Sequence, residues 1–109
     1  MAKRKVIEAI RFFESSLMDS GLNISKIILF GSQAKGNQTK ESDIDLVIIS
    51  DDFKDKDIFE RANITKDAEI KTIKKFLIPF DIVTLTPEEF ENSMFFESTK
   101  EDKVIYAWK

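Results

Sequence analysis

The first twenty residues carry apolar side chains at the spacing of one helix face. This stripe consists of Val6, Ile10, Phe13 and Leu17. Steps of three and four residues place these side chains on one side of a helix, which can then pack on a core. The helix is expected to end near Gly21, because glycine readily adopts the left-handed conformation that commonly follows a helix C-terminus.

Compact apolar runs further along the chain predict a small β-sheet. Three predicted strands cover residues 26–30, 43–50 and 81–85, and a fourth extended segment covers residues 104–108. A helical region from Ile58 to about Leu77 lies between the second and third strands, and its polar residues 63–67 leave open a break there. A crossover of this length suits a helix that packs against the sheet.

Polar segments mark the remaining connections. The charge-rich residues 51–57 predict a solvated loop that leads into the long helical region. Thr86, Pro87 and Glu89 fit the N-cap, N1 and N3 positions of a capping box, so a short helix is expected from there to about Asn92. A further turn of helix is expected within residues 93–100.

Composition limits the class of protein. The chain has 109 residues, of which 42% are hydrophobic, and a net charge of −3, which fits a single globular domain over residues 1–109. The acidic balance makes nucleic acid an unexpected partner. No apolar run approaches the roughly 20 residues of a membrane span, and no signal peptide is visible, so a cytoplasmic location without membrane association is expected.

Histidine and cysteine are both absent from the chain. Their absence excludes disulfides, thiolate zinc sites, a histidine general base and a Ser-His-Asp triad. Carboxylates therefore remain as the available general bases.

A glycine–serine pair follows the first predicted strand directly. Gly31 and Ser32 would form a turn that opens a short helix at residues 32–35, where backbone N–H groups favour a phosphate. Taken alone, the pair also fits an ordinary turn with a serine N-cap. Lys35 is placed to meet a triphosphate, and it fits an exposed helical lysine equally well.

Two aspartates lead into the second predicted strand. Asp43 and Asp45 are two residues apart, so their side chains share one face of an extended chain. Strand interiors disfavour aspartate, although a solvated strand end would tolerate both residues. Paired oxygen ligands that follow a phosphate-binding turn indicate a site for a metal and a nucleotide.

The combined motifs resemble the nucleotidyltransferase superfamily that includes DNA polymerase β, and above all its minimal nucleotidyltransferases, the MNT proteins. The elements that carry the resemblance are Gly31-Ser32-Gln33-Ala34-Lys35-Gly36, Ser42-Asp43-Ile44-Asp45-Leu46 and a third aspartate, Asp81. One departure is Lys35, where many members carry arginine. The resemblance implies an α+β fold of the DNA polymerase β-like type, with a small mixed sheet and helices mainly on one face.

The resemblance also implies roles for these residues. Asp43, Asp45 and Asp81 would be catalytic and would bind one or two Mg²⁺ ions, while Gly31, Ser32 and Lys35 would bind the nucleotide. If Asp81 lies beside Asp43 and Asp45, each like-charge pair about 4 Å apart costs about 4 kcal/mol at an effective dielectric near 20. Such a cluster must be solvated, partly protonated or occupied by divalent cations, and Mg²⁺ suits this set of oxygen ligands. The substrate would be a nucleoside triphosphate, most readily ATP.

Members of this size resemble the antitoxins of HEPN/MNT toxin–antitoxin pairs. The resemblance thus implies transfer of AMP to a hydroxyl of a HEPN-type partner, which fits a chain too short for a separate acceptor-binding domain. Two alternatives stay open. One is a small-molecule transferase of the aminoglycoside-modifying kind, whose members carry an extra helical domain. The other is a non-catalytic module that neutralises its partner by contact.

Overall fold

The computed structural model describes residues 4–30, 43–98 and 103–107. Its elements in chain order are α1 (Arg4–Asp19), β1 (Lys26–Phe30), β2 (Ile44–Ile49), the 3₁₀ turn η1 (Asp51–Phe53), α3 (Ile58–Phe76), β3 (Phe80–Leu85), α4 (Pro87–Glu91), α5 (Met94–Ser98) and β4 (Lys103–Ala107). All four predicted strands are present, and their ends differ from the predicted ends by only a few residues. The predicted helix at residues 32–35 lies outside the described residues.

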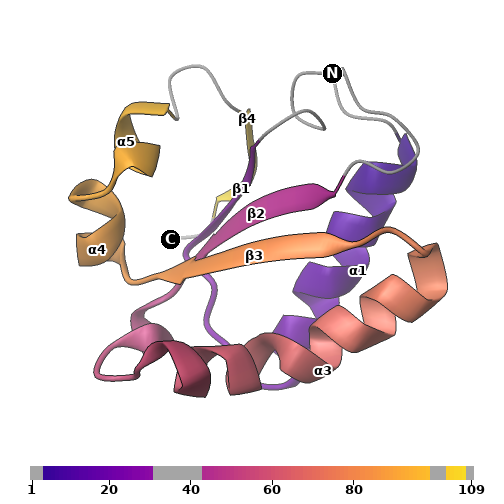
Figure 1. Cartoon of the computed structure of the whole chain (residues 1–109), viewed down its shortest axis with the longest axis horizontal. Helices are drawn as coiled ribbons and strands as arrows, with labels where there is room; N and C mark the ends of the chain where they lie inside the picture. Colours follow the sequence, from indigo (N-terminus) through magenta and orange to yellow (C-terminus); the bar gives the residue numbers. More distant parts are fainter. Residues whose placement is uncertain (1–3, 31–42, 99–102, 108–109) are drawn as a thin grey trace.

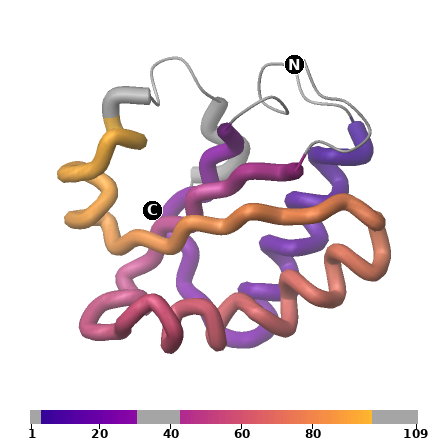
Figure 2. The backbone as a smooth tube through the Cα atoms, in the orientation of Figure 1, coloured from indigo at the N-terminus to yellow at the C-terminus, as the bar shows by residue number. Residues whose placement is uncertain are grey.

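The four strands form one mixed sheet in the order β3-β2-β1-β4. β1 is antiparallel to both β2 and β4, whereas β2 and β3 are parallel. The parallel pair is connected through α3, which carries the chain from the end of β2 back to the start of β3 (Figure 2). The predicted α+β class with a small mixed sheet is confirmed.

The two faces of the sheet are covered unequally (Figure 1). The long helices α1 and α3 pack on one face, where they meet side chains such as Ile27, Leu46 and Phe80. The other face carries Ile28 and Val47 and is partly covered by α4 and α5. Helices therefore lie mainly on one face, as predicted, and the short helices cover the second face only in part.

The end of α1 confirms the prediction at Gly21. The Gly21 N–H donates to Met18 O at 3.0 Å and the Leu22 N–H donates to Leu17 O at 3.1 Å, which is the Schellman arrangement. This arrangement needs a left-handed residue, and Gly21 has φ +98°. The buried Leu22 then directs the chain toward β1.

The long helix α3 is continuous, so the break considered at residues 63–67 is wrong. Its polar side chains Asn63 and Lys66 face solvent, while Thr65 and Ala68 on the inner face are buried. Burial of the inner face thus continues through this stretch and outweighs the low helix propensity of its polar residues. A capping box between Asp57 and Glu60 fixes the start of the helix.

The segment of residues 51–57 is less solvated than predicted. Phe53 is fully buried within η1, and Ser50 caps this turn by accepting a hydrogen bond from the Asp52 N–H at 3.0 Å. One aromatic side chain in a charged stretch therefore anchors the chain to the core.

The predicted capping box at the start of α4 is present. Thr86 Oγ1 accepts from the Glu89 N–H, and Glu89 Oε1 accepts from the Thr86 N–H. Glu89 is also held by the Arg61 guanidinium of α3, with two contacts of 2.7 and 3.0 Å. Arg61 in addition donates to Thr84 O at 3.1 Å, so one side chain joins α3, β3 and α4.

Candidate functional site

Two aspartates lie side by side near the start of the parallel strand pair. Asp45 of β2 is the register partner of Asp81 of β3. Neighbouring strands lie about 4.8 Å apart, and register partners in a parallel pair project from the same face of the sheet. Both carboxylates therefore emerge on the face that α4 and α5 cover only in part. Residues 36 positions apart in the sequence meet here because α3 returns the chain to the same end of the sheet.

Asp43 belongs to the same group by its electrostatic effect. The pKa of the Asp45 carboxyl is raised above its usual value, first by burial, then by the charge of Asp81 and then by that of Asp43. Asp43 itself is exposed and precedes β2 by one residue. The site therefore carries an excess of negative potential centred on the half-buried Asp45.

The chemistry of this group suits a divalent cation, although the ligands are not gathered around one point. Carboxylate oxygens are the ligands that Mg²⁺ prefers, and a cation would relieve the repulsion at Asp45. Among the residues that the structure describes, however, no three side chains of histidine, cysteine, aspartate or glutamate are grouped closely enough to hold a metal ion. Metal binding by Asp43, Asp45 and Asp81 thus stays a prediction.

An aromatic pair borders the carboxylates on the side of β1. Phe30 is the register partner of Asp45 in the antiparallel pair, and its ring packs against Phe95 of α5 at 4.9 Å between centroids. Phe30 is buried and Phe95 is half-buried. This apolar border lies next to Asp45, and burial is the first cause of the raised pKa of the Asp45 carboxyl.

The predicted nucleotide-binding residues Gly31, Ser32 and Lys35 lie outside the described residues. The last described residue before them is Phe30, which pairs with Asp45. Their proposed contacts with phosphate therefore stay predictions.

Glu69 of α3 is a fourth carboxylate near the group, and the sequence analysis missed it. It is half-buried, and its pKa is raised by burial and by the charge of Asp81. The charge of Asp81 thus contributes to the raised pKa of both Asp45 and Glu69. Glu69 follows Thr65 by four residues, so the two side chains share one side of the helix. This spacing is the signal in the sequence that could have pointed to Glu69.

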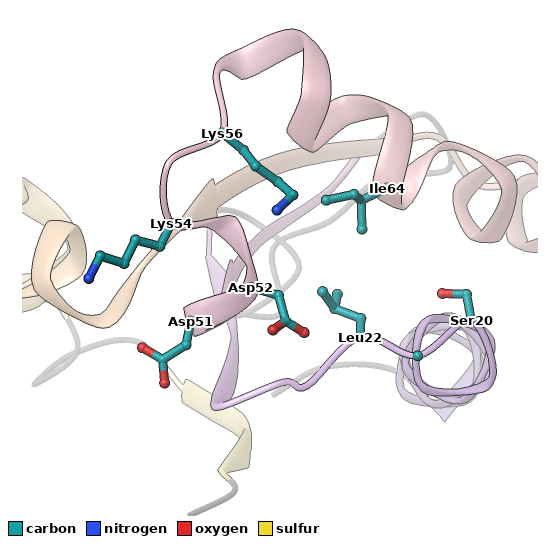
Figure 3. Close-up of a pocket in the computed structure, with 8 residues that line it drawn as sticks. Ser20, Leu22, Asp51, Asp52, Lys54, Lys56 and Ile64 are labelled. Carbon is teal, nitrogen blue, oxygen red and sulfur yellow. The ribbon is translucent and has the colours of Figure 1, made fainter.

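A separate pocket of about 420 Å³ lies at the opposite end of β2. Asp51 and Asp52 of η1 line it together with Leu22, which follows α1 (Figure 3). Asp52 accepts a hydrogen bond from the Asn23 N–H at 2.8 Å, and Ser50 donates to Asn23 O. These bonds fix the connection that leads into β1, so Asp52 has a structural role, and neither Asp51 nor Asp52 belongs to the Asp45–Asp81 group.

The fold and the carboxylate group define a class of protein. A mixed sheet that carries neighbouring aspartates on two parallel strands, with helices mainly on the opposite face, is the arrangement expected of a nucleotidyltransferase domain. The sequence agrees: residues 4–106 match the family described as nucleotidyltransferase domain. The chain belongs to this family.

Individual relatives support the family and the fold. A protein of Methanocaldococcus jannaschii, assigned by inference as a protein adenylyltransferase, is 64% identical over 28 residues, which are 26% of this chain and 28% of that protein. The match thus spans little more than a quarter of that relative.

No described helix is long and apolar enough to cross a membrane.

Two solved structures share the fold. A nucleotidyltransferase of Sulfolobus solfataricus, itself assigned by inference, has a TM-score of 0.59 and 20% identity, with 96% of this chain and 89% of that chain covered. A toxin–antitoxin structure with AMP-PNP has a TM-score of 0.63 and 19% identity, with 94% and 74% covered. At these identities the likeness shows the fold alone.

Proposed function

We propose that this chain is a Mg²⁺-dependent nucleotidyltransferase that transfers AMP from ATP to a hydroxyl group of a protein partner. The observation that carries the proposal is the register of β2 and β3, which sets Asp45 beside Asp81 on a half-open face of the sheet. Membership of the nucleotidyltransferase domain family supports the reaction class. The AMP-PNP in a structure of the same fold supports an adenine nucleotide as the substrate.

Some residues of this chain bind the nucleotide, and others bind the metal or accept the proton of the acceptor. Gly31 and Ser32 bind the β- and γ-phosphates through backbone N–H groups and a hydroxyl, and Lys35 adds a positive charge. Asp43, Asp45 and Asp81 hold Mg²⁺, which supplies charge neutralisation at the phosphate oxygens. The carboxylate of Asp81 accepts the proton of the acceptor hydroxyl.

The reaction is an in-line displacement at the α-phosphorus. The acceptor oxygen forms a bond to the α-phosphorus, the bond from that phosphorus to the oxygen bridging to the β-phosphate breaks, and pyrophosphate leaves with the bonding electrons. Phe30 and Phe95 limit the access of water to Asp45, so that hydrolysis competes less well with transfer.

The acceptor is proposed to be a HEPN-type toxin, and this chain its antitoxin. Support comes from the shared fold with a chain of a toxin–antitoxin structure and from the short match to an inferred protein adenylyltransferase. Transfer of AMP adds a charged group to the partner hydroxyl, which would inactivate a toxin whose activity depends on that region.

The test incubates the chain with α-³²P-labelled ATP, Mg²⁺ and the protein encoded next to it. Wild type is expected to label the neighbouring protein, and Asp45→Asn is expected to lower the rate at least about a hundredfold. Asp51→Asn, which removes an exposed carboxylate at the other end of β2, serves as the matched control and should label at the wild-type rate.

Other outcomes identify the alternatives. A stable complex without label identifies a module that acts by contact alone, and label on an added aminoglycoside identifies a small-molecule transferase. Full transfer by Asp45→Asn would contradict the assignment of the site.

A further inference from the structure

A groove runs along the outer side of β3. One wall is a single stripe of α3 with steps of four, three and four residues, and it consists of Ile58, Ala62, Thr65 and Glu69. The other wall is β3 itself, from Phe80 to Thr84. Two adjoining cavities of about 260 and 430 Å³ follow this line, and Ile58, Ile82 and Thr84 contribute to both. Figure 1 shows α3 running alongside β3 over the length of the strand.

The strand in this groove has backbone groups that face away from β2. β3 is at the edge of the sheet, with β2 as its neighbour. Pro79 O and Leu85 O accept from β2-side N–H groups at 2.9 and 3.0 Å, so the backbone groups of odd-numbered residues face β2. Those of Phe80, Ile82 and Thr84 therefore point outward. Arg61 donates to Thr84 O from that outer side, which agrees with this direction.

The dimensions fit an extended peptide. The helical stripe spans 11 positions, about 16 Å at 1.5 Å per residue, and the strand from Phe80 to Thr84 spans about 13 Å. Four or five residues of extended chain cover this length. The small side chains of Ala62 and Thr65 leave room in the middle of the groove for the side chains of such a segment.

The two ends of the groove differ in chemistry. At one end Glu69 supplies a carboxylate, and Asp81 of β3 lies near it. At the other end Ile58 is 74% exposed and lies next to Ile82, and the same cavity continues to Lys56 and to the Arg61–Glu89 ion pair. A segment that fits the groove should therefore carry a basic side chain toward Glu69 and an apolar side chain toward Ile58.

We infer that a partner protein docks an extended segment of four or five residues on β3 as a fifth strand of the sheet, with its basic side chain at Glu69 and its apolar side chain at Ile58. Backbone hydrogen bonds give such docking affinity, and the side-chain pockets give it selectivity. One part of this inference rests on the proposed function, namely that the docking delivers the acceptor hydroxyl beside Asp81.

A partner of different sequence suits the groove better than a second copy of this chain. Two copies that paired through β3 about a two-fold axis would run antiparallel. Glu69 of each copy would then lie opposite the apolar Ile58 of the other, and a half-buried carboxylate next to an apolar side chain is unfavourable.

The first test uses a displayed library of random heptapeptides, followed by anisotropy measurements on the enriched peptides with a fluorescent label. Enriched sequences are expected to carry a basic residue three or four positions from an apolar one. Ala62→Trp fills the groove and should weaken binding at least about tenfold. Lys66→Trp places the same side chain on the exposed side of α3 and should change binding less than about twofold.

The second test removes one outward N–H without touching the pairing with β2. Thr84→Pro deletes this donor and keeps the Thr84 carbonyl that Arg61 contacts. It should weaken peptide binding about tenfold, whereas Thr84→Ala, which keeps the N–H, should stay within about threefold of wild type. Amide hydrogen exchange should show that the peptide protects Ile82 and Thr84.

The outcomes separate this inference from the proposed function. Peptide binding that survives in Asp45→Asn supports the groove even where AMP transfer fails. Label transfer that is unaffected by Ala62→Trp overturns the groove and leaves the transferase intact. The inference is also overturned if the library yields no peptide whose binding is weakened by Ala62→Trp. It is overturned as well if the free chain forms a dimer that Ala62→Trp dissociates.

Discussion

Asp45 is the residue on which the site depends, and it is held in an unfavourable position. It lies between Phe30 and Asp81 on neighbouring strands, half-buried, with a second carboxylate at Asp43. Burial and like charges both disfavour its ionised form, as the raised pKa of the carboxyl shows. Residues that are kept in such surroundings commonly serve function at a cost in stability.

The first prediction concerns this cost. In the presence of EDTA, Asp45→Asn should raise the free energy of unfolding by about 0.5–1 kcal/mol, because it removes like-charge repulsion at a partly exposed site. Urea denaturation at pH 7 measures the change. Asp51→Asn is the control and should stay within about 0.3 kcal/mol of wild type. A destabilised Asp45→Asn would show that the negative charge is already balanced within the fold.

The second prediction concerns Gly21, whose φ of +98° is unfavourable for other residues. Gly21→Ala should lower the free energy of unfolding by about 1 kcal/mol, through backbone strain alone, since no atom lies within 4 Å of the added Cβ. Gly21→Asn should cost less, because asparagine tolerates the left-handed region better. Thermal unfolding measures both variants, and an unchanged Gly21→Ala would contradict the role of the turn.

At the scale of the elements, the side chain of Arg61 joins α3, β3 and α4. It ties α3 to the start of α4, and the same guanidinium holds the edge of β3 at Thr84. The Arg61 hydrogen bond, with a smaller contribution from Thr86, lowers the pKa of Glu89 from 4.5 to about 2. The position of α4, and with it the extent to which the second face is covered, therefore depends on this ion pair.

The third prediction is the pH dependence of this ion pair. The folded-state pKa of Glu89 lies below its unfolded value, so the stabilisation is complete above pH 4.5 and is lost as the pH falls toward 2. Because the Glu89 side chain is 44% exposed, a double-mutant cycle of Arg61→Ala and Glu89→Ala should give a coupling energy of only about 0.5–1 kcal/mol at pH 7.

The control for this cycle is the pair of Arg4 and Glu8, whose side chains are 93% and 54% exposed. Their coupling energy should be below about 0.5 kcal/mol at pH 7. Equal coupling energies in the two cycles would show that the bidentate geometry at Glu89 adds no stability beyond that of an exposed ion pair.

At the scale of the whole molecule, the fourth prediction uses ligand binding as a readout of the complete site. A non-hydrolysable ATP analogue with Mg²⁺, at about a hundred times its Kd, should raise the free energy of unfolding by about 2.7 kcal/mol. For a domain of this size the Tm should rise by about 10 °C or more. Removal of the metal with EDTA, or Asp45→Asn, should abolish most of this rise. A shift that persists with EDTA would separate nucleotide binding from metal binding.

Local patterns in the sequence were sufficient to predict most of the fold. The helix stripe that ends at Gly21, the strands and the capping box at Thr86 each depend on residues close together in the chain. The continuity of α3 was not predictable in this way, because burial of Thr65 and Ala68 against the rest of the fold overrides local polarity. Tertiary packing commonly decides such segments.

The candidate site was predictable only in part for a related reason. Asp43 and Asp45 share a strand, so their common face follows from strand geometry. The place of Asp81 beside Asp45 depends on the strand register, and that of Glu69 depends on how α3 passes the edge of β3. Neither can be read from spacing along the chain, and the resemblance to a family supplied Asp81 but not Glu69.

The α3 crossover between the two halves of the carboxylate pair has a consequence during protein synthesis. A nascent chain that has emerged from the ribosome only as far as Phe76 already contains Asp45 and the pair of β1 and β2, yet it lacks β3, the strand that carries Asp81. Long-range parallel pairing forms late in folding for the same reason. An unfinished polypeptide should therefore be inert, and its chemistry should begin only when the second strand of the pair has been translated and has joined the sheet.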